Sequence, residues 1–253
     1  MNTYTIRPLV LCQYLGETSA MTYMTGMGKP IFRPFVMWYI KVAEKNVLID
    51  TSMEAEDFKN YHSFYRHLHI EHIQTFEEAL EKVGCAPNDI DIVIQTHLHM
   101  DHVYNTSKCN DATIYVQRAE LEFALNPHPI FEVLYPTDLI RKLNFEIIEG
   151  DQTILPGISV ELVPGHSPGC QAVIVETAKG KAVITGFCSI MGNFDISPDV
   201  KKTVSPMATY PAIAAGIHTD LFQAYDSAVR IKEMGAMIIP AHDPDMAFMN
   251  QIP

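Results

Sequence analysis

The chain has 253 residues, of which 47% are hydrophobic and 19% charged, a composition typical of a globular protein with a buried core and not of a disordered or fibrous chain. The 18 Lys and Arg against 30 Asp and Glu give a formal net charge of −12, which opposes binding to nucleic acid or to anionic membranes. No secretory signal and no run of about 20 apolar residues is visible. The five cysteines are scattered without a Cys-x-x-Cys pair, which indicates a reducing cytoplasm.

The first part of the chain contains a predicted hairpin and a predicted helix start. Residues 35–40 and 46–49 are β-rich runs on either side of a charged turn. Residues 52–74 are crowded with aromatic and His side chains and show no clean period. Thr75 and Glu78 then form a capping box, which predicts that a helix begins there.

Three predicted strands lead directly to histidines. Residues 90–95 form a buried apolar run ahead of His97, residues 158–163 precede His166, and residues 236–240 precede His242. Other elements are predicted as strands at 113–117, 172–176 and 182–185 and as a helix at 221–234. Because α/β folds place their chemistry in the loops after strands, we expect these histidines to meet. No repeat or linker interrupts the chain, which predicts one domain spanning 1–253.

His97, His99, Asp101 and His102 lie within six consecutive residues, 97–102. Two residues apart on a chain leaving a strand, His97 and His99 can direct both imidazoles to one side. Imidazole nitrogens with one carboxylate oxygen suit Zn²⁺, Fe²⁺, Mn²⁺ or Co²⁺. The pattern therefore predicts a metal site.

The segment His-Leu-His-Met-Asp-His resembles the H-x-H-x-D-H signature of the metallo-β-lactamase superfamily. His166 in Pro-Gly-His-Ser-Pro-Gly and His242 in Pro-Ala-His-Asp resemble its later ligands in order and rough spacing. Within the superfamily the chain is most similar to the N-acyl homoserine lactonase branch. The resemblance implies an α/β fold, the single-domain αββα four-layer sandwich, with an insertion at about 52–76 that covers the active site.

The resemblance also implies the roles of particular residues. One metal ion is then held by His97, His99 and His166, and a second by Asp101, His102 and His242. The implied cofactors are one or two divalent metal ions, Zn first and Fe or Mn as alternatives, that activate water against a small, fairly apolar lactone or ester. Asp101 is the first candidate for handling the transferred proton. A homodimer is expected from family habit.

The sequence departs from this family at several positions. Phe187 stands where the family has a bridging carboxylate, and Ile190 where its lactonases have a Tyr. Three outcomes are open: two metal ions bridged by water alone, a single metal ion, or recruitment of another ligand. The candidates for that ligand are Cys188, Asp195 and Asp199. Tyr104, in place of a small residue, is a second candidate catalytic group that donates a proton or orients substrate.

Other interpretations of the sequence remain open. The histidines at 62, 67, 69 and 72 fit a lid or pocket wall, a surface helix or an extra metal site. Residues 21–38 fit a pocket rim or ordinary core, and Arg33 within them is a cation that fits an anionic or nitro-bearing substrate. The rival activities are hydrolysis of an activated aryl ester, aryl ether or amide, and an iron redox reaction. A partner-binding pseudo-enzyme with a reduced metal site is the alternative from another class.

Overall fold

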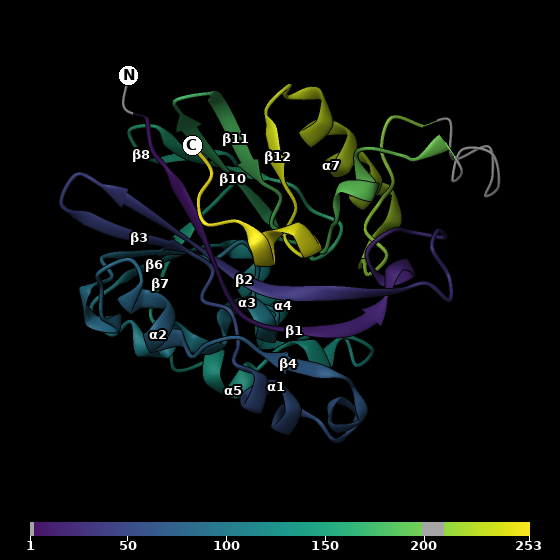
Figure 1. Cartoon of the computed structure of the whole chain (residues 1–253), viewed down its shortest axis with the longest axis horizontal. Helices are drawn as coiled ribbons and strands as arrows, with labels where there is room; N and C mark the ends of the chain where they lie inside the picture. Colours follow the sequence, from purple (N-terminus) through teal and green to yellow (C-terminus); the bar gives the residue numbers. More distant parts are fainter. Residues whose placement is uncertain (1–2, 199–209) are drawn as a thin grey trace.

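The computed structural model describes residues 3–198 and 210–253, so the candidate ligand Asp199 lies outside the described residues. Figure 1 shows two sheets packed face to face with helices on their outer sides. The larger sheet has seven strands in the order β4-β1-β2-β3-β5-β6-β7, and the smaller has five in the order β12-β11-β10-β9-β8. This is the αββα sandwich that the resemblance implied.

The elements have the following bounds. The strands are β1 (Ile6–Glu17), β2 (Pro30–Val42), β3 (Lys45–Ile49), β4 (Ile70–His72), β5 (Ile92–Ile94), β6 (Thr113–Gln117), β7 (Phe145–Ile148), β8 (Gln152–Leu155), β9 (Ile158–Leu162), β10 (Gln171–Thr177), β11 (Gly180–Ile184) and β12 (Met237–Ile239). The described α-helices are α1 (Ala55–Tyr61), α2 (Phe76–Glu81), α3 (Met100–Val103), α4 (Arg118–Leu125), α5 (Thr137–Ile140) and α7 (Leu221–Glu233).

Most predicted elements are confirmed with shifted ends. The hairpin predicted at 35–49 is β2 paired antiparallel with β3, and β2 extends further in both directions. The Thr75 capping box is present at the start of α2, with Glu78 bonding back to the Thr75 backbone. The helix predicted at 221–234 is α7. Strands β1, β4, β7 and β8 were not predicted.

Successive side chains along each strand point to opposite faces of the sheet, and this builds the layers. In β2, Val36, Trp38 and Ile40 pack between the two sheets, whereas Met37 and Tyr39 face α2 on the outside. The outer face of the smaller sheet packs in the same way against α7, for example through Ile231. Because both faces of these sheets are buried, the sequences of the strands are continuous apolar runs.

The direction of the strands brings the predicted loops together. Strands β3, β5, β6 and β7 run parallel in the larger sheet, and β11 and β12 run parallel in the smaller one. The carboxyl ends of β5 and β12 therefore deliver residues 95–102 and 240–243 to one edge of the sandwich, where the loop after β9 joins them.

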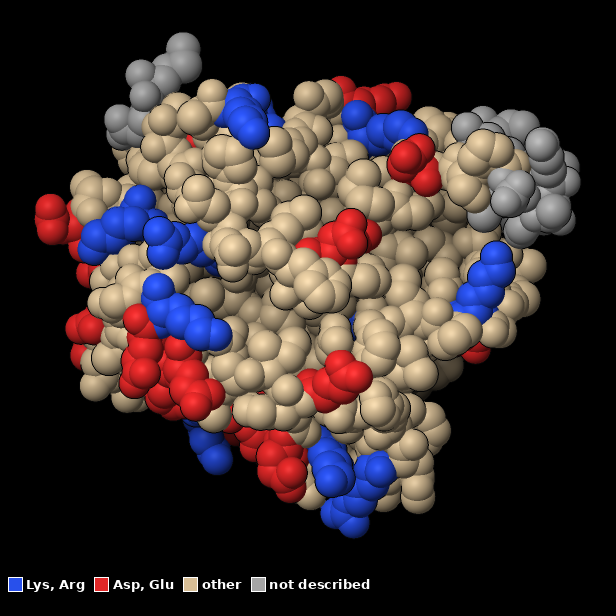
Figure 2. All heavy atoms as spheres, viewed as in Figure 1, with Lys and Arg blue, Asp and Glu red and all other residues tan. Residues whose placement is uncertain are grey.

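None of the helices in the described ranges has the length and apolar character needed to cross a bilayer. On the face that Figure 2 shows, the Lys and Arg side chains of the described residues form small separate groups beside Asp and Glu. That face therefore presents no continuous basic strip to a phosphate backbone.

Candidate metal centre

The structure brings the predicted ligand residues together in two groups. His97, His99 and His166 form one group, and Asp101, His102 and His242 the other, with ligand atoms within 4.8 Å of one another in each. Among the described residues these are the groups of His, Cys, Asp and Glu with such geometry. Each group takes two residues from the segment that follows β5 of the larger sheet, which includes α3, and one histidine from a loop of the smaller sheet. The histidines at 62, 67, 69 and 72 form no such group.

The five histidines are buried, with 1–5% of their surface exposed. The rings of His97 and His166 lie 4.7 Å apart between centroids, and those of His102 and His242 lie 5.4 Å apart. Oδ2 of Asp101 lies 3.6 Å from Nε2 of both His102 and His242. Imidazole and carboxylate donors at these separations fit ligands that surround a divalent ion.

Hydrogen bonds on the far side of the rings settle which nitrogen is free. Nδ1 of His166 lies 2.7 Å from the carbonyl oxygen of Ile217, which only accepts, so this nitrogen donates. Nδ1 of His97 lies 3.1 Å from Oγ1 of Thr96, and that hydroxyl donates its own hydrogen to Asp50. Each ring therefore directs an Nε2 lone pair inward.

The Nε2 atoms of His97 and His166 lie close together. Nε2 of His97 and Nε2 of His166 lie 3.2 Å apart, where two lone pairs repel unless a proton or a cation lies between them. Nε2 of His99 and Nε2 of His102 are also buried without a hydrogen-bond partner. Buried polar atoms without partners are costly, and a metal ion satisfies all of them. The residues present therefore fit divalent metal ions.

The protonation states suit metal ligation. Burial, followed by the neighbouring histidines, lowers the pKa of His97 and His99 well below the usual value. Burial lowers the pKa of His166 and of His242 to about 4. These four rings are therefore neutral at physiological pH, as ligands must be. At His102 burial acts in the same direction, but the carboxylates of Asp101 and Asp50 outweigh it and raise the pKa.

Two carboxylates that the sequence analysis missed position the ligand loops. Asp50, fully buried after β3, accepts hydrogen bonds from Nδ1 of His102 at 2.7 Å and from the backbone N–H of Thr96 at 2.7 Å. Glu120, fully buried in α4, accepts from the N–H groups of Leu98 and Gly169 at 3.0 and 3.1 Å. The sequence offered a signal for Asp50, because a polar residue directly after a predicted strand is a candidate site residue. Glu120 carried none, since its partners are distant in sequence.

The structure does not bring Tyr104 to the ligand groups. Its ring packs edge-on against Tyr61, with centroids 6.2 Å apart, and it lines a neighbouring hollow with Leu125 and Tyr135. Asp101, the other predicted catalytic group, lies among the ligands and is the one of the six that is not fully buried.

The residues around the family's bridging position take other roles. Phe187 is 2% exposed and packs in the core cluster with Phe194, at 6.2 Å between ring centroids. Cys188 lines the pocket at the ligands but donates its Sγ–H to the carbonyl oxygen of Ala20, and burial raises the pKa of its thiol to about 12. Asp195 is exposed, and neither Asp195 nor Cys188 belongs to a ligand group. Ile190 is buried.

A cavity of about 380 Å³ opens onto the ligands. Its walls are largely apolar, and part of them comes from the segment predicted as an insertion. Phe58, Phe64, Tyr65 and Leu68 line the cavity, and Phe58 stacks on Tyr65 with ring centroids 4.5 Å apart. Arg33 of β2 also lines it. An apolar cavity with a few convergent polar groups is typical of a small-molecule site.

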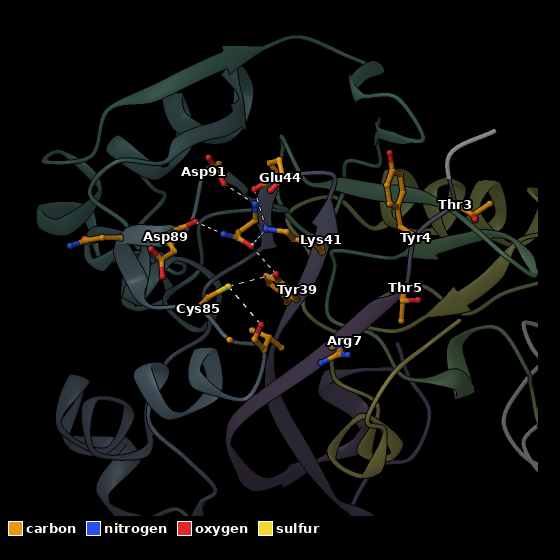
Figure 3. Close-up of a pocket in the computed structure, with 14 residues that line it drawn as sticks. Thr3, Tyr4, Thr5, Arg7, Tyr39, Lys41, Glu44, Cys85, Asp89 and Asp91 are labelled. Carbon is orange, nitrogen blue, oxygen red and sulfur yellow. Dashed lines mark hydrogen bonds between the residues drawn. The ribbon is translucent and has the colours of Figure 1, made fainter.

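The hollow drawn in Figure 3 lies at the amino end of β5, whereas the ligand residues follow the carboxyl end of that strand. Its volume is about 850 Å³. Several polar groups of its wall form hydrogen bonds with one another. Oδ1 of Asn46 accepts from Tyr39 at 2.8 Å and from Lys41 at 3.0 Å, and the Asn46 N–H donates to Asp91 at 2.7 Å (Figure 3). Through Asn46, these bonds fasten the start of β3 to the residues that precede β5.

The layered fold and the two ligand groups at its edge define a metalloprotein of the αββα class. The Metallo-beta-lactamase superfamily model matches residues 34–242, and the chain belongs to this superfamily. The match includes all six ligand residues.

Curated relatives and solved structures refine this placement. The N-acyl homoserine lactonase AiiA of Bacillus thuringiensis subsp. kurstaki is 30% identical over 164 residues, which are 62% of this chain and 64% of that protein. An N-acyl homoserine lactonase of Bacillus cereus is 32% identical over the same shares. The match thus spans less than two thirds of these relatives' length. A solved structure of a B. thuringiensis AiiA mutant with N-decanoyl-L-homoserine bound at the active site gives a TM-score of 0.76 at 25% identity, covering 98% of this chain and 96% of that one.

Proposed function

We propose that the protein is a metal-dependent hydrolase that cleaves a small, fairly apolar lactone or ester, in the manner of an N-acyl homoserine lactonase. The observation that carries this proposal is the convergence of six ligand atoms in two groups of three beneath an apolar cavity. Three protein ligands leave positions open for water and substrate, as a catalytic site requires. The lactonase relatives support the choice of substrate class.

The residues of the site have distinct proposed roles. His97, His99 and His166 hold one divalent ion, and Asp101, His102 and His242 hold a second when both sites are filled. Zinc suits this nitrogen-rich set best, with iron and manganese next. When bound, such an ion lowers the pKa of a water ligand towards neutrality and polarises a carbonyl group. Asp101, the most accessible ligand, handles the transferred proton, and the apolar walls exclude bulk water.

The chain acts as one domain, with residues 52–76 as the insertion that walls the cavity. The acidic balance and the free cysteines favour a cytoplasmic enzyme with a small-molecule substrate, without nucleic acid or membrane as partners. A homodimer is the expected assembly.

A second activity is favoured by one observation. Phe187 and Ile190 are buried apolar residues where homoserine lactonases of the family supply a carboxylate and a phenol. A substrate with a better leaving group has less need of that phenol. Hydrolysis of an activated aryl ester, aryl ether or amide is therefore the alternative.

The test begins with protein purified without added metal. We expect at least one divalent ion per chain by elemental analysis, and hydrolysis of some member of a panel of homoserine lactones and aryl esters. His99→Ala is expected to lower both metal content and activity, whereas His128→Ala, an exposed histidine outside the cavity, is the matched control. Unchanged activity in His99→Ala overturns the metallohydrolase proposal.

Two further variants separate the alternatives. If metal-loaded protein opens no homoserine lactone but a Phe187→Asp variant does, the lactonase assignment fails and the aryl-ester alternative replaces it. Tyr104→Phe tests the remaining sequence prediction for the proton donor. Because Tyr104 lies outside the cavity, we expect kcat to stay within about twofold, and a loss above tenfold assigns the proton to Tyr104 instead.

A further inference from the structure

Arg33 is a buried cation in the wall of the metal cavity. It lies in β2 with 8% of its surface exposed, and its guanidinium carbon lies 4.3 Å from the centroid of the Tyr14 ring. Its Nε is buried without a hydrogen-bond partner, and none of the ion pairs formed within residues 3–198 and 210–253 includes Arg33. A guanidinium held in this state is costly unless an anion joins it.

The strands make room for this side chain. Arg33 pairs across the β1–β2 ladder with Tyr14, and Gly16 lies two residues further along β1, on the same face. A Cβ atom at Gly16 would overlap the Arg33 guanidinium. Gly16 is not in the left-handed region, so the local need for glycine is space for the guanidinium and not backbone conformation.

The cavity offers Arg33 no ion pair, although the Gly28 N–H and, after it, the charge of Arg33 lower the pKa of Glu17. The lining of the cavity contains two carboxylates, Glu17 and Asp101. Asp101 belongs to a ligand group, and Glu17 is an exposed residue whose Oε1 accepts the Gly28 N–H at 2.7 Å. With Phe187 in place of a bridging carboxylate, the six ligands supply one negative charge for up to two divalent ions, and the buried carboxylates of Asp50 and Glu120 behind the ligands add at most two more. The cavity therefore carries an excess of positive charge that an anionic substrate would offset.

We propose that Arg33 binds a carboxylate group of the substrate, so that the enzyme acts on small lactones or esters that carry a carboxylate beside an apolar body. This inference rests on the proposed hydrolase function and narrows its substrate class. The planar guanidinium matches a carboxylate with two parallel hydrogen bonds, and the apolar cavity of about 380 Å³ strengthens such a pair. Arg33 is thus a specificity-determining residue and not a catalytic one.

Binding of a non-hydrolysable probe tests the anchor directly. Benzoate and its neutral isostere benzamide are titrated calorimetrically into metal-loaded protein. We expect benzoate to bind at least tenfold more tightly than benzamide, and Arg33→Gln to remove that preference. Gly16→Ala keeps the charge but displaces the guanidinium, and is expected to reduce the preference as well. Arg66→Gln removes an exposed arginine outside the cavity and is expected to leave the preference unchanged.

A preference for benzoate that survives in Arg33→Gln overturns the proposal, because the metal ions alone then hold the carboxylate and Arg33 only supports Tyr14. Metal content and circular dichroism of each variant establish that the site and fold are retained. Should Arg33→Gln fail to fold, Gly16→Ala and Arg33→Lys carry the test, with Arg33→Lys expected to keep part of the preference.

A hydrolysis assay distinguishes carboxylate binding by Arg33 from the proposed hydrolase activity. The ratio of kcat/KM for 3-carboxyphenyl acetate to that for phenyl acetate is expected to fall at least tenfold in Arg33→Gln and to stay unchanged in Arg66→Gln. Hydrolysis of both esters with no charge preference overturns the anchor alone. Benzoate binding that depends on Arg33, without hydrolysis of any ester or lactone, overturns the hydrolase function and leaves the anchor standing.

Discussion

Asp50 shows how one residue far from the signature conditions the metal site. Its carboxylate accepts from His102 and from both the backbone and the hydroxyl of Thr96, at 2.7, 2.7 and 2.8 Å. It thereby fixes the ring of His102 and, through Thr96, the tautomer of His97. Both ligand groups depend on this single buried side chain.

Asp50→Asn is therefore expected to weaken metal binding while the fold is retained. The φ angle of Asp50 is 56°, in the left-handed region that Asn tolerates, so the backbone is not strained by the change. The amide loses one acceptor, and metal affinity should fall about 10–100-fold, measured by competition with a chromophoric chelator. Asp111→Asn, on the exposed surface, is the control. Equal affinities in the two variants would contradict this role.

Helix α4 couples two ligand loops that are distant in sequence. Glu120 holds the N–H of Leu98, between two ligands, and the hydroxyl of Ser167, next to His166, at 3.0 and 2.5 Å. Both loops therefore rest on one buried carboxylate at the start of α4.

Glu120→Gln replaces one acceptor oxygen with an NH₂ group that faces donors. We expect a loss of stability of about 1–3 kcal/mol in urea unfolding, together with weaker metal binding at the group of three histidines. Glu122→Gln, exposed on the same helix, controls for the change of charge. Loss of stability without any change in metal affinity would mean that Glu120 supports the fold only.

The segment 52–76 contributes an aromatic wall that is open at its edge. Phe64 lines the cavity but is 61% exposed, so its removal costs little packing. Phe64→Ala is expected to raise KM for apolar esters about threefold to tenfold, with kcat and Tm nearly unchanged. Phe222→Ala, 81% exposed and outside the cavity, is the comparison. If KM is unaffected by Phe64→Ala, the wall does not contact substrate.

Local chemistry determined what the sequence could predict about these elements. The hairpin at 35–49 and the helix start at Thr75 were predicted because β-branched and aromatic runs and a capping box are local signals. Strand β1 was missed because it mixes Pro8 and Gly16 with polar residues, and its pairing with β2 is a tertiary effect. The ligands at 97–102 were found from their spacing, and His166 and His242 through the resemblance to the superfamily. Glu120 was not found, because its function exists only after α4 packs against two loops.

For the whole molecule, the metal centre joins the two halves of the sandwich. Each ligand group combines residues that follow β5 of the larger sheet with one histidine from the smaller sheet, His166 or His242. A bound ion is therefore a crosslink between the sheets at one edge. Without it, His99 and His102 keep buried nitrogens that lack partners, and the Nε2 atoms of His97 and His166 repel.

Removal of the metal is accordingly expected to destabilise the entire fold and not the loops alone. A ligand present at 100 times its dissociation constant stabilises the native state by about 2.7 kcal/mol, which for a chain of this size corresponds to a Tm shift of roughly 5–10 °C. Calorimetry of the protein in zinc and in EDTA measures the shift, which should grow with the logarithm of free zinc. His166→Ala should shrink it, since one crosslink is lost, while His128→Ala should not. A Tm that is the same in zinc and in EDTA would show that the two sheets hold together at this edge without any ion.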